Sequence, residues 1–142
     1  MVNYYMATKL PISFAEALER TEEVLKQEGF GIINRIDIQE ALKTKIDVDF
    51  RPYTILGACN PKLAYEALKI EDKVGTMLPC NVVVQELEPG QTEIAAIDPV
   101  ASMQAIENAE LTEAAREVRK KLGRVIETLE TLETLETLVE SE

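Results

Sequence analysis

Two cysteines are the residues of this chain whose types and spacing best suit chemistry. Cys59 lies in the segment Gly-Ala-Cys-Asn-Pro and Cys80 in the segment Leu-Pro-Cys-Asn, so each thiol is followed by an asparagine, Asn60 or Asn81. Two thiols close together can act as a reversible dithiol, or hold a soft metal such as Cu(I) or Zn(II). Free cysteine is also often buried as a small apolar residue. We therefore consider a ligand pocket lined by Cys59, Asn60, Cys80 and Asn81, beside the simpler interpretation that both thiols only fill space.

The types of residue that the chain lacks narrow its chemistry further. It has no histidine, which excludes Ser-His and Cys-His triads and imidazole metal ligands. If a metal is bound, Cys59 and Cys80 are the candidate ligands, and a four-coordinate zinc would need carboxylates or a second chain. No catalytic motif is present, so we do not expect an enzyme, and no cofactor is required by the sequence.

Four carboxylates and two arginines lie outside the expected helix faces. They are Asp37, Asp47, Asp49, Asp98, Arg35 and Arg51. Paired carboxylates can hold Mg²⁺ or Ca²⁺ or transfer protons, and arginines can bind an anion. The simpler interpretation is that the carboxylates cap helices or face solvent, and that the arginines pair with those same aspartates on the surface. We favour the simpler interpretation.

The elements that must position the cysteines follow from periodicity, capping and turn residues. Ser13 marks the beginning of one helix and Gly29 its end. Asn60 is the predicted N-cap of another helix, and Pro61 is its first residue. The patterns predict strands over 2–9, 30–36, 53–58, 80–87 and 92–97, and helices over 13–28, 38–44 and 61–69, with a connection over 99–107 before a last helix. We expect strands 53–58 and 80–87 to be antiparallel neighbours. The two sulfurs then lie within roughly 10 Å at one sheet edge, whereas parallel strands separate them by about 17–20 Å.

The last helix carries an apolar seam that is longer than a small sheet. Its positions, spaced alternately four and three, are Leu111, Ala115, Val118, Leu122, Val125, Leu129 and Leu132. We predict that residues 111–125 pack on the sheet and that Leu129 and Leu132 overhang it. The helix is expected to continue to about residue 132 and to contact a neighbouring subunit or its own body there. Residues beyond 137 are expected to be poorly ordered in solution.

Length and charge define the broad class of the protein. The chain has 142 residues and a net charge of −11, which suits one acidic globular domain. Six glutamates and no base lie in residues 127–142, a Thr-Leu-Glu repeat tail. We expect one domain over 1–127, extended by the tail over 128–142. The acidity argues against nucleic acid and anionic membranes as partners. Two cysteines without an export signal or a membrane span predict a cytoplasmic protein.

Several short segments of the chain together form a recognisable pattern. They are Gly29-Phe30, Asp37, Arg51-Pro52-Tyr53, Ile55–Pro61, Ala64, Leu78–Val84 and Asp98-Pro99. In these segments the chain resembles a family of bacterial and archaeal proteins, the domain of unknown function 302. It implies an α+β domain with two layers, a curved antiparallel sheet with helices on one face, similar to half of the TATA-binding-protein fold. The implied order is β-α-β-(α)-β-α-β-β-α, and the implied assembly is a homodimer. No reaction is implied.

Three functions therefore fit the sequence. The first is a small homodimeric, non-catalytic binding module with a pocket near the two Cys-Asn segments. The second is a thiol-dependent redox protein, or one that handles copper or zinc through Cys59 and Cys80. The third is a structural homodimer whose apolar seam and acidic tail serve partner contact.

Overall fold

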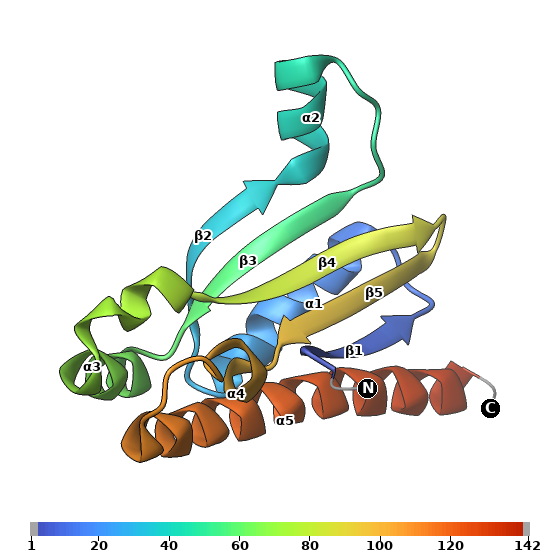
Figure 1. The fold of residues 1–142 in the computed structure, drawn as a ribbon. Helices are drawn as coiled ribbons and strands as arrows, with labels where there is room; N and C mark the ends of the chain where they lie inside the picture. Colours follow the sequence, from blue (N-terminus) through green and yellow to red (C-terminus); the bar gives the residue numbers. More distant parts are fainter. Residues whose placement is uncertain (1–2, 141–142) are drawn as a thin grey trace.

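The fold is an α+β domain with an open antiparallel sheet, as Figure 1 shows for the computed structural model. The structure describes residues 3–140, and side chains through residue 133. Its elements are β1 (Tyr5–Leu10), α1 (Phe14–Gln27), β2 (Gly31–Asp37), α2 (Ile38–Ile46), β3 (Tyr53–Cys59), α3 (Pro61–Ile70), the 3₁₀ helix η1 (Asp72–Met77), β4 (Cys80–Glu88), β5 (Gln91–Ile97), α4 (Pro99–Ser102) and α5 (Ala109–Glu140). The predicted order is confirmed except for two short helices: η1 was not predicted, and α4 lies in the stretch 99–107 that was predicted as a connection.

The sheet has five strands in the order β1-β5-β4-β3-β2, and every neighbouring pair is antiparallel. The strand β1, first in the sequence, therefore lies at one edge of the sheet beside β5, the last strand in the sequence. The helices cover one side of the sheet, which confirms the predicted fold class (Figure 1). The other side is left without a helix, and this asymmetry shapes the surface of the molecule.

Local side-chain caps begin the helices where the sequence placed them. The Ser13 hydroxyl accepts from the Glu16 backbone N–H at 3.2 Å, and Asn60 Oδ1 accepts from the Leu63 N–H at 3.3 Å. Each satisfies a donor that the first helical turn leaves free. Gly29 follows α1 with a φ of +87°, a conformation that glycine adopts without steric cost. These predictions are confirmed.

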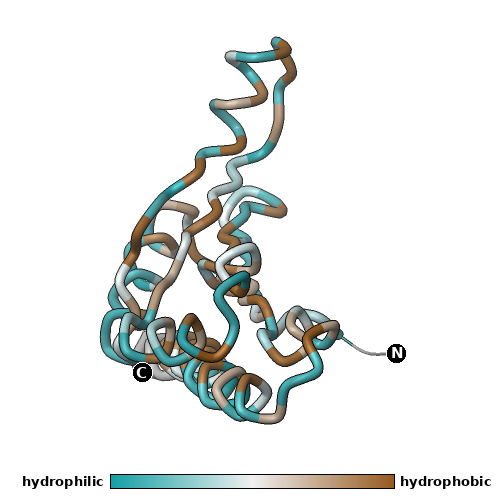
Figure 2. Tube along the Cα trace, turned by 60° about the vertical axis from the view of Figure 1, so that its left-hand side comes forward, coloured by the Kyte–Doolittle hydropathy of each residue, from teal (hydrophilic) through white to brown (hydrophobic). Residues whose placement is uncertain are grey.

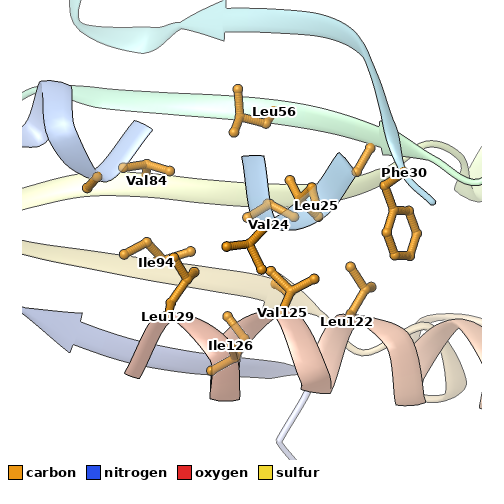
Figure 3. Packing of buried hydrophobic residues seen from close by; sticks show 14 of the residues in the cluster. Val24, Leu25, Phe30, Leu56, Val84, Ile94, Leu122, Val125, Ile126 and Leu129 are labelled. Carbon is orange, nitrogen blue, oxygen red and sulfur yellow. The ribbon is translucent and has the colours of Figure 1, made fainter. Parts of the chain in front are cut away.

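Apolar side chains form two separate buried clusters. The larger one, the main core, lies between the sheet, α1 and α5, where Leu25, Leu122 and Ile94 converge (Figure 3). The second core gathers Ala67 of α3, Val74 of η1, Met103, and Leu111 and Ala115 of α5. Because α5 contributes to both clusters, it is the element that joins them.

The burial of Leu129 and the position at which α5 ends both differ from the prediction. Leu129 does not overhang: it is fully buried in the main core, with Ile94 close by (Figure 3). The helix also runs to Glu140, beyond the predicted end at about 132. The prediction was wrong because it counted only the sheet as covering surface, whereas α5 also lies along α1 and β1.

Polar contacts continue this packing of α5 onto its own chain. The Thr8 hydroxyl donates to Glu130 at 2.9 Å, and Arg20 pairs with Glu133 at 3.3 Å. The predicted contact near residue 132 is therefore made with the body of the same chain. Leu132 itself is 39% exposed. The side chains of residues 134–142, and with them the predicted disorder beyond 137, lie outside what the structure describes.

One part of the chain stands away from the body. The outer ends of β2 and β3, with α2 between them, form a projection that we call the arm (Figures 1 and 2). None of the residues of α2 is buried. The tip of the arm includes hydrophobic segments, shown in brown in Figure 2. Within the described part of the chain, no helix is long and apolar enough to cross a membrane.

Candidate binding site

The register of β3 and β4 brings the two cysteines to one end of the sheet. The strands are antiparallel neighbours, as predicted, and Ala58 lies opposite Cys80. Cys59 is the next residue along β3, so the two cysteines occupy adjacent positions of the ladder. Both are free thiols; Cys80 is buried and Cys59 is partly buried. The sheet topology therefore permits a joint site.

A small apolar cavity lies beside the two thiols. Its volume is about 40 Å³, which exceeds the roughly 10–15 Å³ that one water requires. Its wall combines residues of the main core, such as Phe30, with residues of the second core, such as Met103. The lining residues are Phe30, Ala58, Cys59, Asn60, Leu63, Ala64, Ala67, Leu78, Pro79, Cys80, Pro99, Met103, Leu111, Ala114, Ala115 and Val118. The cavity thus marks the boundary between two separately packed clusters.

Burial controls the chemistry of one thiol. It raises the pKa of Cys80 to about 11, and the neighbouring Cys59 adds to the rise. Cys80 is therefore a neutral thiol near pH 7. Since the thiolate is both the nucleophile and the metal ligand, a neutral Cys80 acts as a small apolar wall residue.

The two asparagines are placed on different surfaces. Asn60 lines the cavity, where its side-chain oxygen is engaged as the cap of α3. Asn81 follows Cys80 in a strand, so its side chain points to the opposite face of the sheet and is exposed. The structure brings Cys59, Asn60 and Cys80 together and separates Asn81 from them. The alternation of side chains along a strand is the signal that predicts this separation.

On that opposite face, Asn81 lies next to a glycine that the structure requires. Gly57 is opposite both Asn81 and Asn34 in the ladder. A Cβ atom on Gly57 would lie 2.0 Å from Asn34 Oδ1 and 2.8 Å from Pro79 Cγ. A side chain at position 57 would therefore displace one of these neighbours, and glycine leaves the room for both.

The carboxylates considered above serve local structure. Asp37 caps α2 by accepting from the Glu40 N–H at 3.0 Å. Asp98 caps α4 by accepting from Val100 N–H at 2.9 Å, and its other oxygen pairs with Arg119 at 3.2 Å. Lys43 pairs with the exposed Asp47 at 2.9 Å and with the exposed Asp49 at 3.3 Å. The interpretation as caps and surface residues is confirmed.

The partners predicted for the two arginines were wrong. Arg35 pairs with Glu22 of α1, because its side chain points to the helical side of the sheet. Arg51 donates to Gln85 Oε1 at 2.8 Å and lies over the ring of Phe50, 4.3 Å from its centroid. Neither arginine is paired with the aspartates.

No cluster of three or more Cys, Asp or Glu side chains suited to a metal is found among the residues that the structure describes. Cys59 and Cys80 would therefore need additional ligands from outside this set to hold a tetrahedral metal. The side chains that line the cavity are predominantly apolar.

A second hollow, which the sequence analysis missed, lies on the uncovered side of the sheet. It has a volume of about 330 Å³ and is lined by Tyr4, Tyr5, Tyr53, Asn81, Val83, Gln85, Glu93, Ala95, Ala96 and Ile97. Gln85 bridges the strands here by donating to Glu93 at 3.1 Å. The signal in the sequence was the uninterrupted apolar run Val82-Val83-Val84, which puts apolar side chains on both faces of one strand.

Comparison with known proteins identifies relatives of the whole domain. Residues 6–129 match the family model described as Domain of unknown function DUF302. The chain is also similar to the crystal structure of an uncharacterized conserved DUF302 protein from Bacillus stearothermophilus. The two share 33% sequence identity with a TM-score of 0.82, over 89% of this chain and 98% of that chain. No curated protein matches the sequence.

Proposed function

Because this chain belongs to the DUF302 family, a domain of unknown function, we propose from its own geometry that it is a non-catalytic binding module. It takes up a small apolar ligand in the cavity between the cysteine ends of β3 and β4 and the helices α3 and α5. The observation that carries the proposal is the apolar cavity at the boundary of the two cores.

The position of the cavity supports binding because its outer wall belongs to a lightly anchored helix. Ala67 is the one buried residue of α3. A cavity of about 40 Å³ admits only a few atoms. A larger ligand therefore requires α3, which contributes one buried side chain to the second core, to move away from α5.

The absence of catalysis is supported by the state of the groups that could react. The chain has no histidine, and burial keeps Cys80 neutral through the rise in its pKa. Asp37 and Asp98 are engaged as helix caps. A net charge of −11 supports a partner other than nucleic acid, and the two free thiols support a reducing compartment, the cytoplasm.

Xenon, benzene and indole test the cavity directly, because apolar cavities of proteins take up such probes. In ¹⁵N–¹H NMR spectra, xenon is expected to shift the amide signals around Cys59 and Ala115 in a saturable way, and benzene or indole to shift those of α3 as well. Ala115→Val fills the cavity and is expected to abolish the shifts. Ala15→Val, on the exposed face of α1, is the matched control. Unchanged cavity amides in the native protein would contradict the proposal.

We also propose that the module is a homodimer. Several large apolar side chains remain exposed on the single chain, among them Tyr4 at 65%, Ile46 at 62% and Ile36 at 43%. Contiguous exposed apolar surface is typical of association sites, and Ile36 and Ile46 both lie on the arm. Sedimentation equilibrium of the native protein is expected to give the mass of two chains.

A second candidate function is a thiol-dependent redox protein or one that handles soft metals. It is supported by the adjacent positions of Cys59 and Cys80 in the ladder. The raised pKa of Cys80 opposes it. Thiol titration with and without Cu(I) or Zn(II) separates the candidates. Thiols that react slowly with the reagent, without metal uptake, support the binding module. Rapid reaction of both thiols, together with metal uptake, supports the alternative.

A further inference from the structure

The side of the sheet without helices, here called the open face, carries two cross-strand rows without charge. The central row runs through Ala7, Ala95, Val83, Ile55 and Ile36, which the registers place side by side. The next row runs through Tyr5, Ile97, Asn81, Gly57 and Asn34. Charged residues make up 29% of the chain, so rows of ten uncharged positions mark a distinct surface. Depletion of charge is the compositional mark of an interface core.

The strands below this surface have the composition of strands covered on both sides. The runs Val82-Val83-Val84 in β4 and Ile94–Ile97 in β5 place apolar side chains on each face. Such runs are typical of strands that are buried on both faces. The helices of this chain cover only one of the two faces (Figure 1). The open face therefore lacks the cover that its composition indicates.

The arm presents a second uncovered apolar surface beside the first. In α2, Ile38, Leu42 and Ile46 are spaced four apart and form one stripe. None of them is buried, and Ile46 is 62% exposed. Ile36, in the central row of the open face, belongs to the base of the arm, so the two surfaces are continuous.

We propose that the open face and the arm together form the surface that binds a second copy of this chain; the proposal rests on the homodimer proposed above. The two uncharged rows and the apolar stripe of α2 can pack against the same residues of a second copy, as a two-fold interface requires. The row beyond them carries Lys9 and Glu93, which lie opposite each other and so add no net charge. Two chains of charge −11 repel one another overall, which favours contact through the rows without charge.

The area of the surface explains why both parts are needed. Five strands about 4.8 Å apart and about 20 Å long give the open face roughly 500 Å². A stable interface buries roughly 800 Å² on each partner. The open face alone falls short of this value, and the arm of each copy supplies the remainder by lying against its partner.

Two substitutions test the surface in the native full-length chain by sedimentation equilibrium. Val83→Lys places a charge in the central row, and Ile46→Lys places one on the arm. Each is expected to weaken dimerisation about 100-fold while the far-UV circular dichroism stays that of the folded chain. Leu68→Lys changes an apolar side chain of α3 that is 42% exposed and lies outside the surface, and is expected to leave the dimer intact.

The outcomes separate this proposal from the dimer itself. If the native protein is still a monomer at a concentration of about 100 µM, which corresponds to association weaker than about −5.5 kcal/mol, both proposals are overturned. If it is a dimer and the two lysine variants dimerise as tightly as the native chain, only the proposed surface is overturned. Should Val83→Lys unfold, Ile46→Lys decides, because α2 has no buried residue whose loss could unfold the domain.

Discussion

At the scale of single residues, burial determines what the cysteines can do. Cys80 lies where a strand begins, with little access to solvent and with Cys59 beside it. Its neutral state favours packing over nucleophilic chemistry. The same burial makes the thiol contribute to stability in a way that depends on pH.

We expect Cys80 to make the native protein less stable at alkaline pH. Its pKa rises from 9.0 to about 11 on folding, so the unfolded chain releases the proton first as the pH increases. The contribution is complete below pH 9 and is lost as the pH rises through 11. The native free energy of unfolding should therefore fall by about 2–3 kcal/mol more than that of Cys80→Ala between pH 8 and 11. Urea unfolding across this range measures it, and parallel curves for the two proteins would disprove the assignment.

At the scale of elements, α5 contributes to both buried clusters, and its residues beyond Leu129 contact other elements of the same chain. Leu111 and Ala115 belong to the second core, and Leu122 and Leu129 to the main core. Beyond Leu129, the contacts of Glu130 with Thr8 and of Glu133 with Arg20 attach the helix to β1 and α1. The helix α5 therefore connects the main core, the second core, β1 and α1 by direct contacts.

Truncation of α5 tests whether its residues 127–133 stabilise the domain. A chain ending at Ile126 lacks the fully buried Leu129 and both polar contacts. It should lose roughly 3–5 kcal/mol of stability, as expected when a large buried side chain is removed. A chain ending at Glu133 keeps these contacts and serves as the matched control, with a stability close to that of the native protein. Thermal unfolding measures both, and equal melting temperatures for the two truncations would show that Leu129 contributes nothing.

At the scale of the whole molecule, the proposed assembly balances apolar attraction against charge repulsion. Each chain carries a net charge of −11, whereas the two central rows of the open face carry no charge. Salt screens the repulsion between the two bodies and leaves apolar contact intact.

We therefore expect added salt to strengthen the dimer. Between 20 and 200 mM sodium chloride, the dissociation constant measured by sedimentation should fall several-fold, since the Debye length shortens from about 20 Å to about 7 Å. Urea at a non-denaturing concentration provides the opposite control, because it weakens apolar association. A dissociation constant that increases with salt would instead indicate an interface built on ion pairs.

The sequence by itself determined the features that depend on residues within one turn of each other. Ser13, Asn60 and Asp98 cap their helices through bonds to backbone groups two or three residues away, and Gly29 supplies the left-handed residue after α1. Such interactions are formed whatever the rest of the chain does. The order of helices and strands was predicted on this basis, whereas the antiparallel sheet, in which β3 pairs with β4, was implied by the resemblance to a family.

Only the tertiary structure decided which surface covers each side chain. Leu129 is buried because α1 and β1 lie beside α5, and Arg35 pairs with Glu22 because α1 crosses its side of the sheet. Cys80 is buried and Asn81 is exposed because helices cover one face of the sheet and leave the other open. Burial is a property of elements distant in sequence that meet in space, and no local pattern specifies which elements meet.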